Sequence, residues 1–337
     1  MFVLSKISNF GERKGLQLRG VGMRVKQMNI KGGMSALEII EEMAGAGVFI
    51  AGRLARAVRV LSEMIGNEDV TVFFGAAGAL VPAGLGRIIA EMIYDGFVDV
   101  VVTTGANITH DLIEAFGGAH VKDIKGEDDK LREKGVNRIF DSYVSDDAFV
   151  VFEKRIQEIL MDIPVEKREK GIPVYELLRE VGLRVNYKHS FVKAAAETGV
   201  PIFCPAITDS ILGLQMWLFS QKNALRLDVL EDLHKIVSMA YESKKAGAFI
   251  LGGGVPKNHI LQAMLLTGRG FDYAVQITLD RPESGGLSGA TLSEAKSWGK
   301  VAKNAVTVDV IADVTITLPL IFSALKEILG GKKTTTD

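Results

Sequence analysis

Short apolar runs rich in β-branched residues recur along the chain. Each is followed by a glycine or polar turn and then by apolar residues at helical spacing. Six such runs are expected to be strands: 70–74, 98–103, 201–206, 248–251, 273–278 and 306–311. Their hydrophobicity is continuous rather than alternating, which is typical of strands buried on both faces of a parallel sheet. The pattern therefore predicts an α/β fold, a doubly wound, mostly parallel sheet with helices on both faces.

The 337 residues are long enough for one large α/β domain, and composition divides the chain further. Residues 1–33 carry seven basic side chains and one acid, which we interpret as a basic arm packing across another subunit rather than contacting nucleic acid. Residues 119–195 are more charged and are expected to form a helical insertion. This insertion belongs to a single domain, 34–329, and 330–337 is expected to be a disordered tail.

The composition also excludes several classes of protein. Forty basic and 41 acidic residues nearly cancel, which argues against a protein that coats nucleic acid or an anionic membrane. A single cysteine rules out an intrachain disulfide framework and suits a reducing compartment. The five histidines lack metal-ligand spacing, so no metal is expected. Without a signal peptide or an unbroken membrane span, the chain is expected to be cytoplasmic.

Glycine and polar residues gather where the expected strands end, which is where open parallel sheets bind ligands. They are Gly75, Gly78, 103–110, 208–209, 252–254 and Asp313. Glycine allows close backbone approach, and helix N-termini suit a pyrophosphate. Neither GxGxxG nor a P-loop occurs, so nucleotide binding and plain tight turns both stay open. Asp209 and Asp313 are candidates to accept hydrogen bonds from ribose hydroxyls or to neutralise a cationic substrate, with helix capping as the alternative.

A glycine-serine loop at residues 283–291 leads into a short helical stretch that carries Glu294, Trp298 and Lys300. A lysine beside an indole in a water-poor cleft could remain an uncharged amine and form an imine with a carbonyl compound. The indole could also cover the alkyl chain of a cationic ligand. Since most lysines are solvated surface charges, the residues alone leave that plain interpretation open.

The segment SEAKSWGK, residues 293–300, closely resembles the EAxSWGK signature of deoxyhypusine synthase. Other segments follow in that family's order over residues 35–325: VDVVVTTGANITHDLIEAFGGAH, KGVNRIFDSYV, VPIFCPAITDSILG, AFILGGGVPKNHI, YAVQI and VIADVTITLPL. The resemblance implies a homotetramer of Rossmann-like subunits with shared active sites. It also implies that NAD oxidises spermidine, whose aminobutyl group passes through a lysine imine to a lysine of the translation factor 5A precursor.

The resemblance also implies roles for individual residues. Lys300 matches the imine-forming lysine, and Glu294 and Trp298 match residues that line the polyamine tunnel. Ser288 matches a serine of the substrate loop. Positions that contact NAD are matched by Gly78, Thr104, Gly105, Asp209, Gly252, Gly253, Gly254 and Asp313.

The chain departs from the familiar eukaryotic pattern at several substrate positions. His110 replaces a glutamate that contacts polyamine and cofactor, Leu214 and Leu287 replace aspartates, Asn258 replaces a histidine, and Gly78 with Ala79 replaces a serine-asparagine pair. Each carboxylate missing around a spermidine trication would cost on the order of 1–3 kcal/mol. The pattern fits an archaeal or bacterial branch with a remodelled amine site, in which His110 could accept a proton.

Three functions are consistent with the residues. The first is a deoxyhypusine synthase that modifies a protein lysine. The second is a paralogue that transfers aminobutyl to a small amine and makes homospermidine or a related polyamine. The third is a non-catalytic NAD-binding subunit, against which the joint presence of Glu294, Trp298 and Lys300 argues.

Overall fold

Six parallel strands form the central sheet of the computed structural model, which describes residues 23–330. They are β1 (Val70–Ala76), β2 (Val100–Thr103), β5 (Ile202–Phe203), β6 (Lys245–Leu251), β7 (Phe271–Thr278) and β8 (Val301–Ile311). Their order is β5-β2-β1-β6-β7-β8, and every neighbouring pair is parallel. Counted along the chain, this is the 3-2-1-4-5-6 order of Rossmann dinucleotide-binding folds. All six expected strands lie in this sheet, and the predicted doubly wound α/β fold is confirmed.

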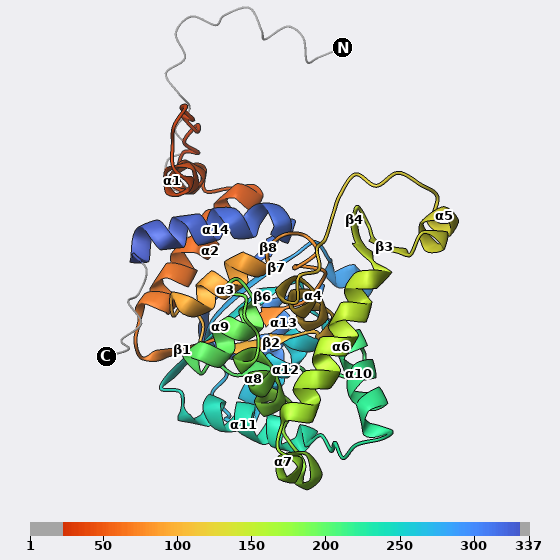
Figure 1. The fold of residues 1–337 in the computed structure, drawn as a ribbon. Helices are drawn as coiled ribbons and strands as arrows, with labels where there is room; N and C mark the ends of the chain where they lie inside the picture. Colours follow the sequence, from red (N-terminus) through yellow and green to blue (C-terminus); the bar gives the residue numbers. More distant parts are fainter. Residues whose placement is uncertain (1–22, 331–337) are drawn as a thin grey trace, which may run out of the picture.

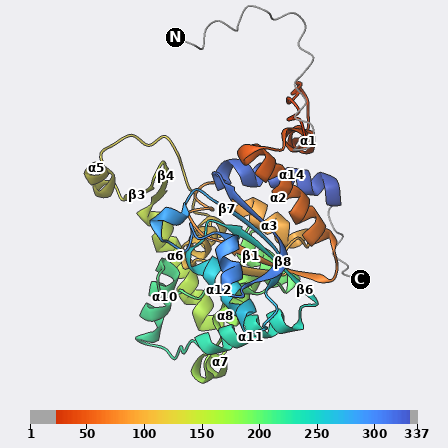
Figure 2. The ribbon, with the colours of Figure 1, turned by 180° about the vertical axis from the view of Figure 1, so that it is seen from behind.

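Helices cover both faces of the sheet because side chains alternate along each strand (Figures 1 and 2). In β1, Val72 and Phe74 join one buried cluster, whereas Phe73 joins a second cluster across the sheet. The first cluster includes α2 (Phe49–Gly66), α3 (Gly86–Tyr94) and α14 (Val314–Leu329). The second includes α11 (Val229–Glu242), α12 (Gly254–Leu265) and α13 (Leu292–Ser297).

Two helices precede the sheet. Helix α1 (Ala36–Ala46) begins with a capping box between Ser35 and Glu38 and ends at Gly47, whose φ of 70° favours glycine. Figure 1 shows α1 at one edge of the molecule, where it packs against α2 and α14, and α2 lies beside α14. Residues 1–22 of the expected basic arm and 331–337 of the expected tail lie outside the described residues.

The insertion is not purely helical, so that expectation was incomplete. Besides α5 (Asp128–Glu133), α6 (Asp146–Asp162), α7 (Val165–Lys170), α8 (Val174–Leu183) and α9 (Phe191–Thr198), it contains the antiparallel hairpin of β3 (Val136–Ile139) and β4 (Ser142–Ser145). Phe140 in the two-residue turn has a φ of 58°, the left-handed conformation that tight hairpin turns require. Because Phe-Asp is not a typical turn pair, the sequence gives little sign of this hairpin. Figure 1 shows β3, β4 and α5 projecting from one side of the molecule.

The buried carboxyl group of Asp111 connects two helices far apart in sequence, α4 (Gly105–Ala115) and α9. It accepts hydrogen bonds from Ser190 Oγ at 2.5 Å, from Phe191 N at 3.1 Å and from Val192 N at 3.2 Å. Burial raises the pKa of Asp111 to about 7 against the effect of these donors. Asp111 therefore holds α4, which begins where β2 ends, against α9 of the insertion.

Among the helices of residues 23–330, none combines the length and apolar character that crossing a membrane requires. Helix α10 (Ile211–Ser220) and the single turn η1 (Pro282–Ser284) complete the elements of this part of the chain.

We expect Asp111→Ala to lower the free energy of unfolding by roughly 3 kcal/mol, because it leaves three buried donors without their acceptor. Guanidinium unfolding followed by circular dichroism measures this. Asp162→Ala, at an exposed position on α6, is the matched control and should change stability by less than about 0.5 kcal/mol. Equal effects of the two substitutions would contradict the role of Asp111.

The raised pKa of Asp111 also predicts a pH dependence. A carboxyl group whose pKa is higher in the folded than in the unfolded protein stabilises the fold at low pH, and this contribution is lost as pH rises. Asp111→Asn stays neutral at every pH. Measured against this variant, the wild-type protein should lose stability between about pH 4 and pH 7. An unchanged difference across that range would contradict the prediction.

Candidate active site

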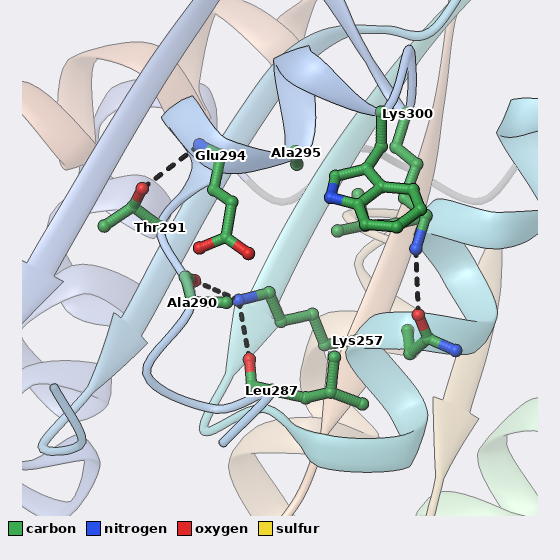
Figure 3. Close-up of a pocket in the computed structure, with 10 residues that line it drawn as sticks. Lys257, Leu287, Ala290, Thr291, Glu294, Ala295 and Lys300 are labelled. Carbon is green, nitrogen blue, oxygen red and sulfur yellow. Dashed lines mark hydrogen bonds between the residues drawn. The ribbon is translucent and has the colours of Figure 1, made fainter. Parts of the chain in front are cut away.

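A pocket between α12 and α13 brings together three of the residues singled out in the sequence. Glu294, Trp298 and Lys300 line it, together with apolar side chains such as Leu261 and Leu287 (Figure 3). Its cavity volume is about 240 Å³, less than the roughly 300–1,000 Å³ of pockets that hold drug-sized ligands. This pocket therefore suits a slender chain rather than a dinucleotide.

Lys300 is held in this pocket through both its backbone and its side chain. Its backbone N donates to Ala295 O and its carbonyl accepts from Phe271 N, both at 3.1 Å, immediately before β8 begins. Its Nζ donates to Asn258 Oδ1 at 3.0 Å and lies 5.6 Å from the centroid of the Trp298 ring. Trp298 is 64% exposed, so the indole forms an outer wall of the pocket. The amine therefore has a fixed position next to an aromatic face.

Glu294 approaches the pocket from the other end of α13. The helix begins after Thr291, whose hydroxyl accepts a hydrogen bond from Glu294 N at 3.1 Å. In Figure 3 the carboxylate points into the pocket on the side of Lys257. One carboxylate among apolar walls is an arrangement that suits the ammonium group of an alkyl amine.

Lys257 is a site residue that the sequence interpretation missed. Its side chain is buried, and its Nζ donates hydrogen bonds to the carbonyl groups of Leu287, at 2.9 Å, and of Ala290. Burial lowers the pKa of Lys257 to about 8. It therefore ties the 287–290 loop to α12 below the pocket. The available signal was a charged residue in the first turn of a helix whose other residues are largely apolar.

Ser288 lies behind the pocket rather than among the residues that line it. Its carbonyl accepts from Gln276 Nε2 at 2.8 Å, and the same amide donates to Gly252 O at 3.1 Å. Its hydroxyl donates to Asp280. A Cβ on Gly253 would lie 2.3 Å from Ser288 Cα, so the glycine run at the end of β6 lets the loop approach the strand.

A second cleft lies where strand order reverses, between β1 and β6, and its volume is about 440 Å³. Gly78, Gly252 and Asp313 line it, and so does the tip of the β3–β4 hairpin with the exposed Phe140. Gly78 has a φ of 91°, which favours glycine. Asp313 caps α14, since its Oδ1 accepts from both the backbone N and the hydroxyl of Thr315 at 2.7 Å. A carboxylate retains further acceptor sites beyond these two bonds.

A third cleft lies beside the N-terminus of α4, and Asp209 and His110 line it. Thr104 caps α4 by accepting from Asn107 N at 3.3 Å. A Cβ on Gly105 would lie 2.4 Å from the Ser210 side chain, so this turn also requires glycine. The alternative interpretation of Asp209 as a helix cap is wrong, because Ser210 caps α10.

The candidate residues that line clefts are thus divided among three clefts, whereas Ser288, Thr104, Gly105, Gly253 and Gly254 line none of these three. His110 is not among the residues that line the Lys300 pocket. Of the substituted positions, Asn258 and Leu287 do line that pocket, whereas Leu214 is an exposed residue of α10. A single chain therefore does not assemble all of these residues into one site.

The second cleft can accommodate a dinucleotide. It lies at the switch point of the sheet, where Rossmann folds bind such ligands, and its glycines leave backbone exposed. Gly78 has no atom within 4 Å of the position of a Cβ. Asp313, which lines this cleft, offers acceptor sites of the kind that ribose hydroxyls use.

Three comparisons with known proteins each find similarity to deoxyhypusine synthases. A model of the deoxyhypusine synthase family matches residues 38–325. The "probable deoxyhypusine synthase" of Methanosarcina thermophila and the "probable deoxyhypusine synthase 1" of Methanosarcina acetivorans are each 49% identical over 309 residues, covering 91% of this chain and 96% of theirs. The crystal structure of a "putative deoxyhypusine synthase" from Entamoeba histolytica has a TM-score of 0.64 and 22% identity, and covers 89% of this chain and 96% of that one. That last likeness concerns the fold alone.

We expect Gly253→Ala to displace the loop at Ser288, because the added Cβ would clash with backbone. Hydrogen exchange at residues 287–291 should accelerate, and stability should fall by about 1–3 kcal/mol, the usual cost of overpacking. Gly286→Ala is the matched control, since its Cβ would lie 3.5 Å or more from its neighbours. Identical exchange in the two variants would show that the loop does not depend on this contact.

Proposed function

The chain belongs to the deoxyhypusine synthase family, and from this premise we propose that it transfers the aminobutyl group of spermidine to one lysine of the translation factor 5A precursor. The transfer uses NAD and passes through an imine on Lys300. The observation that carries the proposal is the convergence of Lys300, Trp298 and Glu294 on one narrow, largely apolar pocket.

The pocket matches the chemistry of an aminobutyl chain. Its volume of about 240 Å³ is enough for a chain of four methylene groups, and the Trp298 face attracts a neighbouring cation. Glu294 lies in the first turn of α13, and Lys300 lies just after the other end of this helix. An ammonium group can therefore bind the Glu294 carboxylate while the carbon to be transferred lies near Lys300 Nζ.

Lys300 acts as the nucleophile in this proposal. Its Nζ bonds to the imine carbon of oxidised spermidine, and diaminopropane leaves with the displaced nitrogen. The attack needs a lone pair on Nζ, whose direction is set by the hydrogen bond that Nζ donates to Asn258 Oδ1. Asn258 is thus a positioning residue. Lys257 supports the same pocket from below by fixing the 287–290 loop.

The cleft at the strand-order switch is the proposed NAD site. When bound, NAD supplies the hydride acceptor that amine oxidation requires. In this proposal Gly78, Gly252–Gly254 and Asp313 would hold one part of NAD at this cleft. Thr104, Gly105 and Asp209 would hold another part at the third cleft beside the N-terminus of α4, which Leu80 connects to the second cleft through its hydrogen bond to Asn107. The support for this assignment is that the glycine turns and the Asp313 carboxylate lie at the switch point of the sheet and that α4 begins beside the third cleft.

A homotetramer in the cytoplasm completes the proposal. Leu287 and Trp298 at the rim of the Lys300 pocket are exposed in the single chain, at 50% and 64%. Covering them with a second subunit would exclude water from the imine, and it would let His110 from another cleft face the polyamine. No nucleic acid or membrane is expected to take part.

Intact mass spectrometry of the translation factor 5A precursor tests the activity, after incubation with the protein, NAD and spermidine. We expect an aminobutyl mass gain that Lys300→Ala abolishes and that Lys303→Ala, the exposed lysine three residues on, retains. Borohydride should trap the adduct on Lys300. New polyamines without modified factor would instead favour the homospermidine paralogue. NAD binding without any adduct would favour a non-catalytic subunit.

We further expect Leu287→Asp to lower the KM for spermidine about 5- to 10-fold. A carboxylate at this half-exposed position restores about 1 kcal/mol of attraction for an ammonium group. Steady-state kinetics at low ionic strength measure the change. Leu287→Asn has the same shape without the charge and should leave the KM near that of the parent. If both variants behaved alike, charge at position 287 would not govern amine recognition.

A further inference from the structure

Three side chains form a hydrogen-bonded row that ends in the cleft beside Asp209. Glu114 Oε1 accepts from the backbone N of His120 at 3.0 Å and lies 2.6 Å from His120 Nδ1. His120 Nε2 lies 2.8 Å from His110 Nδ1, and the two rings meet edge to face with centroids 4.9 Å apart. His110 then lines the cleft. The row leads from a carboxylate through a nearly buried imidazole to a ligand-accessible one.

The chemistry of the three groups fixes the positions of the protons. An ionised carboxylate only accepts hydrogen bonds, so His120 Nδ1 carries a proton and donates a hydrogen bond to Glu114. This bond holds the pKa of Glu114 below its usual value and keeps the carboxylate charged. In the arrangement that we infer, Nε2 of His120 carries no proton and accepts a hydrogen bond from His110 Nδ1. The row therefore leaves an unprotonated nitrogen, Nε2, on His110.

His110 Nε2 is thus suited to accept a proton. Burial lowers the pKa of His110 to about 4, so the ring is neutral at physiological pH and holds an added proton only if the charge can move on toward Glu114. When Nε2 gains a proton, the Nδ1 proton can pass to His120. The positive charge then lies beside the Glu114 carboxylate, as in triads where a carboxylate stabilises an imidazolium.

The three groups are arranged in a row and do not surround a common point. Among residues 23–330, no group of three or more His, Cys, Asp or Glu side chains is placed to hold a metal ion. The side chain of His120 is 6% exposed and that of Glu114 is 32% exposed, whereas the cleft that His110 lines is also lined by Asp209, Thr109 and Ser210. The carboxyl group of Asp111, one residue further along α4, already accepts hydrogen bonds from Ser190 and Phe191 at the start of α9. Asp209 is thus the other charged group at the cleft end of the row.

We propose that His110 is the proton acceptor in the oxidation of the amine substrate, and that His120 and Glu114 position it and take up the charge. The proposal rests on the proposed function, which provides the amine and NAD. Oxidation of a secondary amine to an imine releases a hydride, which NAD takes up, and one proton from nitrogen, which His110 Nε2 accepts. Lys300 and His110 of the same chain line different clefts. In this proposal His110 of one subunit therefore accepts the proton of an amine that is bound at Lys300 of another subunit.

Nitrogen-15 NMR of histidine-labelled protein tests the row without substrate or NAD. The chain has five histidines, so single substitutions assign their signals. We expect His110 and His120 each to carry the proton on Nδ1. In Glu114→Ala both rings should lose their preference for a proton on Nδ1. In Glu114→Gln, which keeps an acceptor oxygen, both rings should retain it. Wild-type His110 protonated on Nε2 instead would overturn the proposal.

Stopped-flow formation of NADH with spermidine tests the function of the row in the full protein. His110→Ala should slow the half-reaction by about 10²–10⁴-fold, the usual contribution of general base catalysis. His120→Gln should slow it by about 10–100-fold with little change in spermidine affinity. His234→Asn, at an exposed position on α11, is the control and should match the wild type.

The two possible failures can be told apart. If the wild type forms NADH but the His110 and His120 variants do so equally fast, the relay is wrong and the proposed function stands. If the wild type forms no NADH although NMR shows the expected tautomers, the proposed function is wrong. In that case the row would not serve amine oxidation, and the relay proposal would fall with it.

Discussion

The close approach of Gly253 to Ser288 is the constraint on which the rest of the site depends. It brings the end of β6 against the loop that follows β7, so that the strand end and the loop share one hydrogen-bonding side chain, Gln276. The same loop is fixed on its other side by Lys257. Gly252 lines the cleft at the strand-order switch and Leu287 lines the Lys300 pocket, so this contact couples the two. A side chain at position 253 would separate them.

The reversal of strand order explains why the chain has several clefts. The β1–β6 switch point provides a wide cleft with exposed backbone, whereas α12 and α13 enclose a narrow one on the face of the sheet. The α4 N-terminus provides a third, lined by His110 and Asp209. Each has a different chemical character, with glycine and carboxylate in the first, lysine and indole in the second, and imidazole in the third. The proposed assembly of subunits is what would combine them.

The sequence predicted the fold to a large extent, because apolar strands that are buried on both faces carry a strong continuous signal. All six main strands were located, although β5 is shorter and β6 begins earlier than expected. The β3–β4 hairpin was missed, since its turn places Phe140 in a conformation usually taken by glycine or asparagine. The segment SEAKSWGK predicted that Glu294, Trp298 and Lys300 act together, and these three residues do line one pocket. Lys257, Glu114 and His120 escaped because their roles depend on partners that only the tertiary structure reveals.

Charge decides how an amine can enter the Lys300 pocket. Two lysines and one acid, Glu294, are among the residues that line it, so the single chain offers a polycation less compensation than spermidine requires. The leucine at position 287 adds apolar contact and no charge. Additional carboxylates must then come from beyond this pocket, and the exposed rim around Trp298 is where a second subunit would bring them. Amine recognition and subunit assembly would therefore be a single event, since the acids that neutralise the substrate arrive with the surface that excludes water from the imine.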